Sequence, residues 1–132
     1  MPEFSRSMGI LVWTPIRTVQ AFTMDAANEA GLPSSRSTLA ATIVSDLVRS
    51  VRYWCKEGEG ELKVSKVGRG IGVELTCRGE DVLERPDWLA GSDISWSKLM
   101  EVVDDMESWH EPPSKAGVSF LVYDSPGRKS LD

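Results

Sequence analysis

Polar and apolar residues alternate in two neighbouring segments, 62–67 and 71–77, on either side of Gly68-Arg69-Gly70. An alternation with a period of two turns one set of side chains toward a core and the other toward water, which is typical of a β-strand. Glycines in a short connection favour the tight turn of a β-hairpin. The pattern therefore predicts an antiparallel hairpin over 62–77.

Shorter segments predict further strands. The apolar run from Met8 to Trp13 stops at a proline, and the residues from Val118 to Asp124 alternate again. A further short strand is expected near Ser108 to Glu111. These segments are brief and are bounded by turn residues, as strands usually are.

Three other segments have the spacing of an α-helix, because apolar residues recur in them every three or four positions. One helix is predicted over 16–30, with Thr14 as its N-cap, Pro15 as its first residue and Gly31 as its stop. A longer helix is predicted from Ser34 or Ser35 to Trp54. A third is expected to start at Asp93 or Ser95, with an apolar face made of Trp96, Leu99, Met100, Val103 and Met106.

This order of elements predicts the α+β class, as a two-layer α/β sandwich in which about three helices cover a mostly antiparallel sheet. The 132 residues correspond to a single domain. We expect the domain proper to span 8–124. Residues 1–7 are expected to be disordered or added during cloning, and 125–132 to form a polar tail.

Charge and composition narrow the range of partners. The net charge is −5, so the chain repels phosphate backbones and anionic lipid, and neither nucleic acid nor a membrane is expected as a partner. No apolar run reaches the roughly 18 residues needed to cross a bilayer, and no secretion signal is visible. Cys55 and Cys77 do not form a Cys-x-x-Cys pair, so we expect reduced thiols and a cytoplasmic location.

Isolated polar residues give weak signals. His110 is the single histidine, and it lacks partners at zinc-site spacing. Asp104 and Asp105 are adjacent on the third predicted helix, so they favour a solvated face over a catalytic pair. Arg49 and Arg52 precede two aromatic residues, but the acidic balance of the chain argues against a nucleic-acid patch.

Three stretches carry a family resemblance: Ser45 to Ser50 on the second helix, Cys77 to Val82 after the hairpin, and Ser92 to Ser97 before the third helix. Together with the element order over roughly 8–124, they resemble the nucleotide-binding core of the histidine-kinase-like ATPase (GHKL or Bergerat) fold. The nearest resemblance is to the small bacterial serine kinases of stress and anti-sigma-factor signalling. Those kinases phosphorylate sulfate-transporter/anti-sigma-antagonist (STAS) proteins.

The motif on the second helix departs from the family pattern Glu-Leu-x-x-Asn. Asp46 stands at the glutamate position, which in the family activates a water or the acceptor hydroxyl, and it is one methylene shorter. Ser50 stands at the asparagine position, which in the family binds Mg²⁺. Mg²⁺ requires close octahedral geometry, so the shorter reach of Ser50 weakens that site.

The motif after the hairpin departs further from the family pattern Asp-x-Gly-x-Gly. Cys77 stands where the family aspartate accepts the adenine amino group, and a thiol is a poor acceptor. Gly79 alone keeps one of the two glycines, and Glu80-Asp81 add negative charge near the phosphates. The glycine-rich lid, whose backbone N–H groups hold phosphate in the family, is matched by 92–97, where Asp93 and Trp96 oppose phosphate.

The resemblance therefore implies a degenerate kinase-like regulator that acts by protein–protein interaction and needs no cofactor. Its cleft would consist of Asp46, Arg49, Ser50, Cys77 and Gly79, with no catalytic residue and no metal. Its partner would be a STAS-domain protein or a sigma-factor regulator, bound through Trp88, Asp46 and Arg49. Relatives often pair, so a homodimer is also compatible with the resemblance.

Two alternatives stay open. The chain could be an active, divergent serine/threonine kinase that uses ATP and Mg²⁺ to phosphorylate a STAS-domain antagonist, with Asp46 as the base and Ser50 as the metal ligand. It could also be an unrelated α+β binding module.

Overall fold

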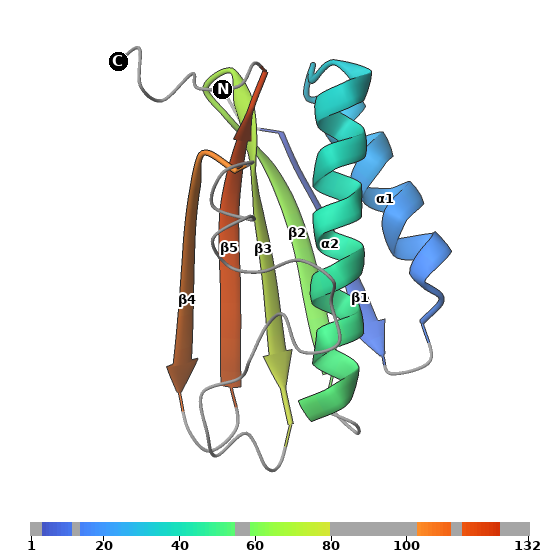
Figure 1. Ribbon diagram of the computed structural model, residues 1–132, viewed down its shortest axis with the longest axis vertical. Helices are drawn as coiled ribbons and strands as arrows, with labels where there is room; N and C mark the ends of the chain where they lie inside the picture. Colours follow the sequence, from blue (N-terminus) through green and yellow to red (C-terminus); the bar gives the residue numbers. More distant parts are fainter. Residues whose placement is uncertain (1–3, 12–13, 55–58, 80–102, 112–114, 125–132) are drawn as a thin grey trace.

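One antiparallel sheet, in the order β1-β2-β3-β5-β4, organises the structure (Figure 1). The structure is a computed structural model that describes residues 4–11, 14–54, 59–79, 103–111 and 115–124. Within these residues the sheet has five strands: β1 (Ser5–Leu11), β2 (Glu59–Val67), β3 (Gly70–Arg78), β4 (Asp105–Glu111) and β5 (Lys115–Tyr123). All four pairings between neighbouring strands are antiparallel.

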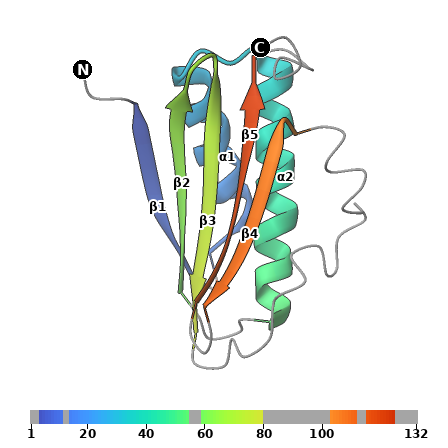
Figure 2. The same cartoon turned by 90° about the vertical axis from the view of Figure 1, so that its left-hand side faces the viewer.

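The helices α1 (Ile16–Glu29) and α2 (Ser34–Trp54) pack side by side on the same face of this sheet (Figure 2). The described chain is therefore a two-layer α+β sandwich, and the predicted fold class is confirmed. The helix predicted to begin at Asp93 or Ser95 falls outside the described residues up to residue 102, and the structure describes only the residues from 103 onward. Neither described helix combines the length and the hydropathy needed to cross a bilayer.

The core lies between the helices and the three central strands. Leu62, Leu75 and Val118 stand opposite one another in a single row across β2, β3 and β5, and each is at most 2% exposed. Ile43 and Leu47 of α2 are buried to the same degree in the same cluster. Burying an aliphatic side chain of this size stabilises the fold by roughly 1.5–3 kcal/mol relative to exposure, so these rows hold the two layers together.

Glycines end α1 and turn the hairpin, as their positions in the sequence predict. Gly31 has φ +99°, its N–H donates to the Asn28 carbonyl, and the Leu32 N–H donates to the Ala27 carbonyl. This pair of bonds is the Schellman arrangement, which needs a left-handed residue after the helix. Gly68, with φ +57°, supplies the same backbone freedom between β2 and β3.

Two local predictions at the starts of elements need correction. Thr14 does not cap α1, because the N-cap is Pro15, which makes no side-chain cap bond; its carbonyl accepts from the N–H groups of Thr18 and Val19. β1 begins at Ser5, so residues 5–7, which the sequence pattern placed before the domain, belong to its first strand.

The prediction that the third helix extends through Val103 and Met106 is also wrong. Val103 and Asp104 form a bend, and the chain from Asp105 onward is the strand β4. β4 pairs with β5 over its whole length, from Asp105↔Leu121 to Glu111↔Lys115. The ladder bonds of that pairing outweigh the helical spacing of Val103 and Met106, since tertiary pairing commonly overrides a local pattern.

Candidate functional site

The C-terminal half of α2 carries three of the predicted cleft residues, Asp46, Arg49 and Ser50, and their exposure to solvent differs. Arg49 is exposed, Asp46 is half-buried and Ser50 is fully buried. Ser50 stands three residues after Leu47 and seven after Ile43, so helical geometry places it on the same core-facing stripe. This part of α2 therefore presents a carboxylate and a guanidinium to the surface and keeps the Ser50 hydroxyl inside.

Cys77 and Gly79 come from the last residues of β3 and the position just after it. Cys77 is 3% exposed and shares the helix-covered face with Leu75 and Val73. β3 and α2 both finish at the same end of the sandwich (Figure 1). The predicted cleft residues therefore lie in the halves of α2 and β3 that run toward the same end of the sandwich, on two elements that are distant in sequence.

Two of the predicted cleft residues, Arg49 and Asp46, form an ion pair within α2. Arg49 Nη1 donates to Asp46 Oδ1 across 3.3 Å, and the two side chains are 53% and 18% exposed. A pair of this spacing on a helix surface contributes about 0.3–0.5 kcal/mol. Its importance for stability is small, so these two charges are available to meet a partner at little cost to the fold.

The described residues offer little for a metal ion. No group of three or more His, Cys, Asp or Glu side chains in the described ranges could hold one. At the family's Mg²⁺ position the chain presents the fully buried hydroxyl of Ser50. The remaining predicted site residues, Trp88, the 80–82 stretch and the lid segment 92–97, lie outside the described residues.

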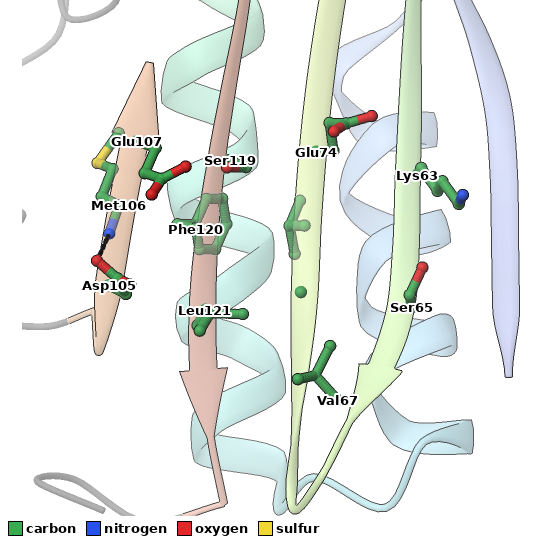
Figure 3. A pocket seen from close by; sticks show the side chains of 12 residues that line it. Lys63, Ser65, Val67, Glu74, Asp105, Met106, Glu107, Ser119, Phe120 and Leu121 are labelled. Carbon is green, nitrogen blue, oxygen red and sulfur yellow. Dashed lines mark hydrogen bonds between the residues drawn. The ribbon is translucent and has the colours of Figure 1, made fainter. Parts of the chain in front are cut away.

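The opposite face of the sheet carries a groove that the sequence analysis did not anticipate (Figure 3). Its volume is about 410 Å³, and β2, β3, β4 and β5 all line it. Gly72 lies at the floor of the groove. A Cβ added to Gly72 would lie 3.3 Å from Val67 Cγ2 and 3.4 Å from Leu121 Cδ2, so the glycine keeps this part of the groove open. The charged lining residues are Lys63, Glu74, Asp105 and Glu107. Antiparallel sheets commonly leave one such polar face in water.

A second hollow, of about 360 Å³, lies on the same face beside Trp109. The Trp109 indole lies directly over Gly117, where any Cβ would meet the ring. Arg78 and Lys115 line the hollow together with Glu59 and Glu61, so its charge is balanced. The balance of charge selects no class of ligand.

Sequence patterns could not reveal this face. Its rows are formed by residues from distant parts of the chain, such as Glu61, Thr76, Gly117 and Trp109. Gly117, directly before the alternating segment that predicts β5, was the one available signal, because a glycine inside a strand often marks the close approach of another group.

No protein-family model matches the chain, and no curated protein matches it. The likeness to histidine-kinase-like ATPases therefore stays a prediction that rests on the motif positions and the order of the elements.

Proposed function

We propose that this chain is a degenerate kinase-like regulator that acts by binding another protein in bacterial stress or sigma-factor partner switching. Its partner would be a STAS-domain protein or a sigma-factor regulator, and its place of action the cytoplasm. It would work by occupying a surface of that partner and displacing a competitor, without transferring phosphate.

The order of the described elements supports the likeness to the kinase fold. A strand, two helices and a hairpin are followed by a final strand pair, and both helices cover one face of the sheet. This is the frame on which the sequence resemblance rests. Fold alone does not establish function, however, so the proposal depends on the residues at the cleft positions.

The buried thiol of Cys77 is the observation that carries the loss of nucleotide binding. At 3% exposure, Cys77 occupies the position where the family needs a carboxylate to accept from adenine. A thiol is a weak acceptor, and a lost recognition bond of this kind costs about 1–3 kcal/mol. Each 1.4 kcal/mol is a tenfold loss of affinity, and the buried Ser50 removes the metal contribution as well.

The surface half of the site supports binding to a protein. Asp46 and Arg49 offer one charge of each sign on the wet side of α2, and their mutual ion pair is weak. Paired charges of this type set orientation and specificity in interfaces more than raw affinity. We therefore assign them to partner recognition, together with Trp88 as predicted from the sequence.

Calorimetry and thermal denaturation with MgATP and MgADP test the nucleotide part of the proposal. A nucleotide that binds the folded state stabilises it by mass action, by about 2.7 kcal/mol at a hundred times its Kd. We expect no heat of binding and no change in Tm at millimolar nucleotide, with Mg²⁺ alone as the control. Binding at micromolar nucleotide would overturn the proposal.

One observation favours an active kinase as the second candidate. The Asp46 carboxylate is partly open to water and lies one helical turn from Ser50, the spacing of the family's base and metal ligand. Incubation with radiolabelled ATP and candidate STAS-domain proteins tests it. Phosphate transfer that Asp46→Asn abolishes would establish the kinase, whereas equal background with both proteins would exclude it.

A further inference from the structure

On the outer face of the sheet, opposite the helices, one row of side chains places two carboxylates on either side of a hydroxyl. Glu74 of β3 and Glu107 of β4 both stand opposite Ser119 of β5, which lies between them. Neighbouring strands lie about 4.8 Å apart, so the backbones of Glu74 and Glu107 are separated by roughly 10 Å. Both glutamates are exposed. A single group above Ser119 is therefore within reach of both carboxylates.

These two carboxylates have no cation of their own. Among the described residues, no ion pair includes Glu74 or Glu107. Lys63 of β2 stands opposite Glu74 in the register, yet no ion pair joins these two residues. Figure 3 shows the Lys63 ammonium turned away from β3 and the Glu107 carboxylate turned toward Ser119. The row centred on Ser119 therefore carries an excess of negative charge.

Another row of the same face shows the charge arrangement that stabilises a sheet in water. There Glu59 stands opposite Arg78, and Lys115 stands opposite Glu111, so each carboxylate has a cation on the next strand. Opposite charges across neighbouring strands stabilise a sheet. The row centred on Ser119 lacks this balance between β3 and β4. We infer that its counter-charge comes from outside the chain.

The groove of about 410 Å³ on this face combines the carboxylates with apolar surface. Val67 is exposed, Leu121 is half-buried, and Gly72 keeps the floor between them open. A long cationic side chain lays its apolar stem along surface of this kind and keeps its charged end at polar groups. The lining of the groove thus matches the two parts of such a side chain.

The donors of a lysine ammonium match the acceptors of this row in number. Glu74, Ser119 and Glu107 offer acceptor oxygens on three neighbouring strands. An ammonium is a compact charge with three N–H donors, whereas the guanidinium of an arginine is a planar fork suited to a single carboxylate. Glu74 is exposed, and rotation of an exposed side chain takes only picoseconds to nanoseconds. Its carboxylate can therefore turn toward an ammonium above Ser119.

We propose that this groove binds a lysine side chain on the surface of a partner protein. Pockets for small molecules enclose most of their ligand, whereas this groove opens across four strands and both of its glutamates are exposed. An open site of this kind fits a lysine that a protein surface holds in place. The net charge of −5 also attracts a basic partner and orients its approach.

The inference does not depend on the proposed function. Asp46 and Arg49 lie on α2, which covers the other face of the sheet (Figure 2). The two surfaces are separate, so the chain can hold a partner on each of them at the same time.

Titrations of the full chain followed by proton–nitrogen NMR test the site. The probe is the blocked peptide acetyl-Ala-Leu-Lys-Leu-Ala-amide, and its control is the same peptide with Nε-acetyl-lysine, which has no charge. We expect millimolar free-lysine peptide to shift the amide signals of Ser119 and Glu107, and the acetylated peptide to leave them unchanged. n-Butylamine, which is the lysine side chain without its peptide, should bind more weakly than the peptide.

Glu107→Gln and Glu111→Gln form a matched pair of variants. Each removes one carboxylate from an exposed position on the same face of β4, but of the two residues only Glu107 lines the groove. Water screens a charge pair in an open groove, so Glu107→Gln should raise the Kd of the free-lysine peptide about threefold to fivefold. Glu111→Gln should leave this Kd unchanged.

Four results would overturn the proposal. The first is the absence of shifts at high millimolar peptide, and the second is equal binding of the acetylated peptide. The third is an equal rise of Kd in both variants, which would indicate general attraction to an acidic protein. The fourth is binding of n-butylamine as tight as that of the peptide, which would assign the groove to small amines.

Discussion

Arg36 and Asp104, 68 residues apart in the chain, form a buried ion pair that joins the start of α2 to the strand pair β4–β5. Arg36 Nη2 lies 3.3 Å from Asp104 Oδ2, and the side chains are 10% and 6% exposed. Both side chains also bond to the backbone of Tyr123. Arg36 Nε donates to the Tyr123 carbonyl across 2.9 Å, and the Tyr123 N–H donates to Asp104 Oδ2 across 2.8 Å. A cation in the first turn of a helix opposes the helix dipole, and Asp104 offsets that cost.

Removal of one partner of this pair should destabilise the fold strongly. Asp104→Ala leaves the Arg36 guanidinium buried without its counter-charge, and breaking a buried pair in this way costs about 3–5 kcal/mol. Urea denaturation, extrapolated linearly to zero denaturant, gives the free energy of unfolding of each variant.

The double variant Arg36→Met with Asp104→Leu is the matched control, because it removes both charges and keeps the volume apolar. It should be more stable than Asp104→Ala alone. Arg49→Ala, which breaks the exposed pair with Asp46, should change stability by less than about 0.5 kcal/mol. Equal losses of stability in Asp104→Ala and Arg49→Ala would contradict the conclusion that the Arg36–Asp104 pair is buried and the Arg49–Asp46 pair exposed.

Gly117 should tolerate no side chain, because the Trp109 ring occupies the place of its Cβ. Gly117→Ala should displace the indole and reduce stability by about 1–3 kcal/mol, the usual cost of overpacking. The indole N–H resonance of Trp109 in a proton–nitrogen NMR spectrum should shift at the same time. Gly9→Ala, at an open position of β1, is the control and should alter neither quantity.

Leu47→Ala should show how much the helix layer depends on its central contact. Leu47 is 1% exposed within the core cluster. Truncation of a buried leucine costs about 2–5 kcal/mol through lost transfer energy and the cavity left behind. Thr42→Ala, on the exposed side of α2, should stay within about 0.5 kcal/mol of the wild type. Chemical denaturation of the two variants in parallel measures the difference.

Reversal of the charge at Arg49 should weaken partner binding without unfolding the protein. Arg49→Glu places a second carboxylate beside Asp46 on the exposed side of α2. If this surface recognises a STAS-domain protein, binding measured by surface plasmon resonance should weaken about tenfold or more, since like charges that face each other across an interface cost several kcal/mol and each 1.4 kcal/mol is tenfold. Arg17→Glu, exposed on α1, is the control and should bind normally. Equal binding by both variants would place the interface elsewhere.

Most of the described fold was predictable because local patterns and long-range packing agree. The alternation on either side of Gly68 matches β2 and β3, and the spacing from Ile43 to Leu47 matches the buried face of α2. The stop at Gly31 also follows from local chemistry, since a left-handed backbone favours glycine.

The prediction failed where pattern and pairing disagree. Val103 and Met106 have helical spacing, yet β4 starts at Asp105 because β5 offers a full ladder of hydrogen bonds. Of the predicted cleft, Asp46, Arg49 and Ser50 lie in the C-terminal half of α2, and Cys77 and Gly79 lie at the end of β3 and just after it. That Ser50 and Cys77 are buried while Arg49 is exposed could not be read from the motif alone.

The sequence by itself determined the two described helices, the β2–β3 hairpin and the α+β class, because side-chain periodicity and glycine conformation act over a few residues. Only the tertiary structure decided that Arg36 meets Asp104, that Trp109 covers Gly117, and that β1 ends the sheet with its backbone exposed. Each of these depends on which distant segments become neighbours. That choice is made by the burial of the whole core, and no local pattern encodes it.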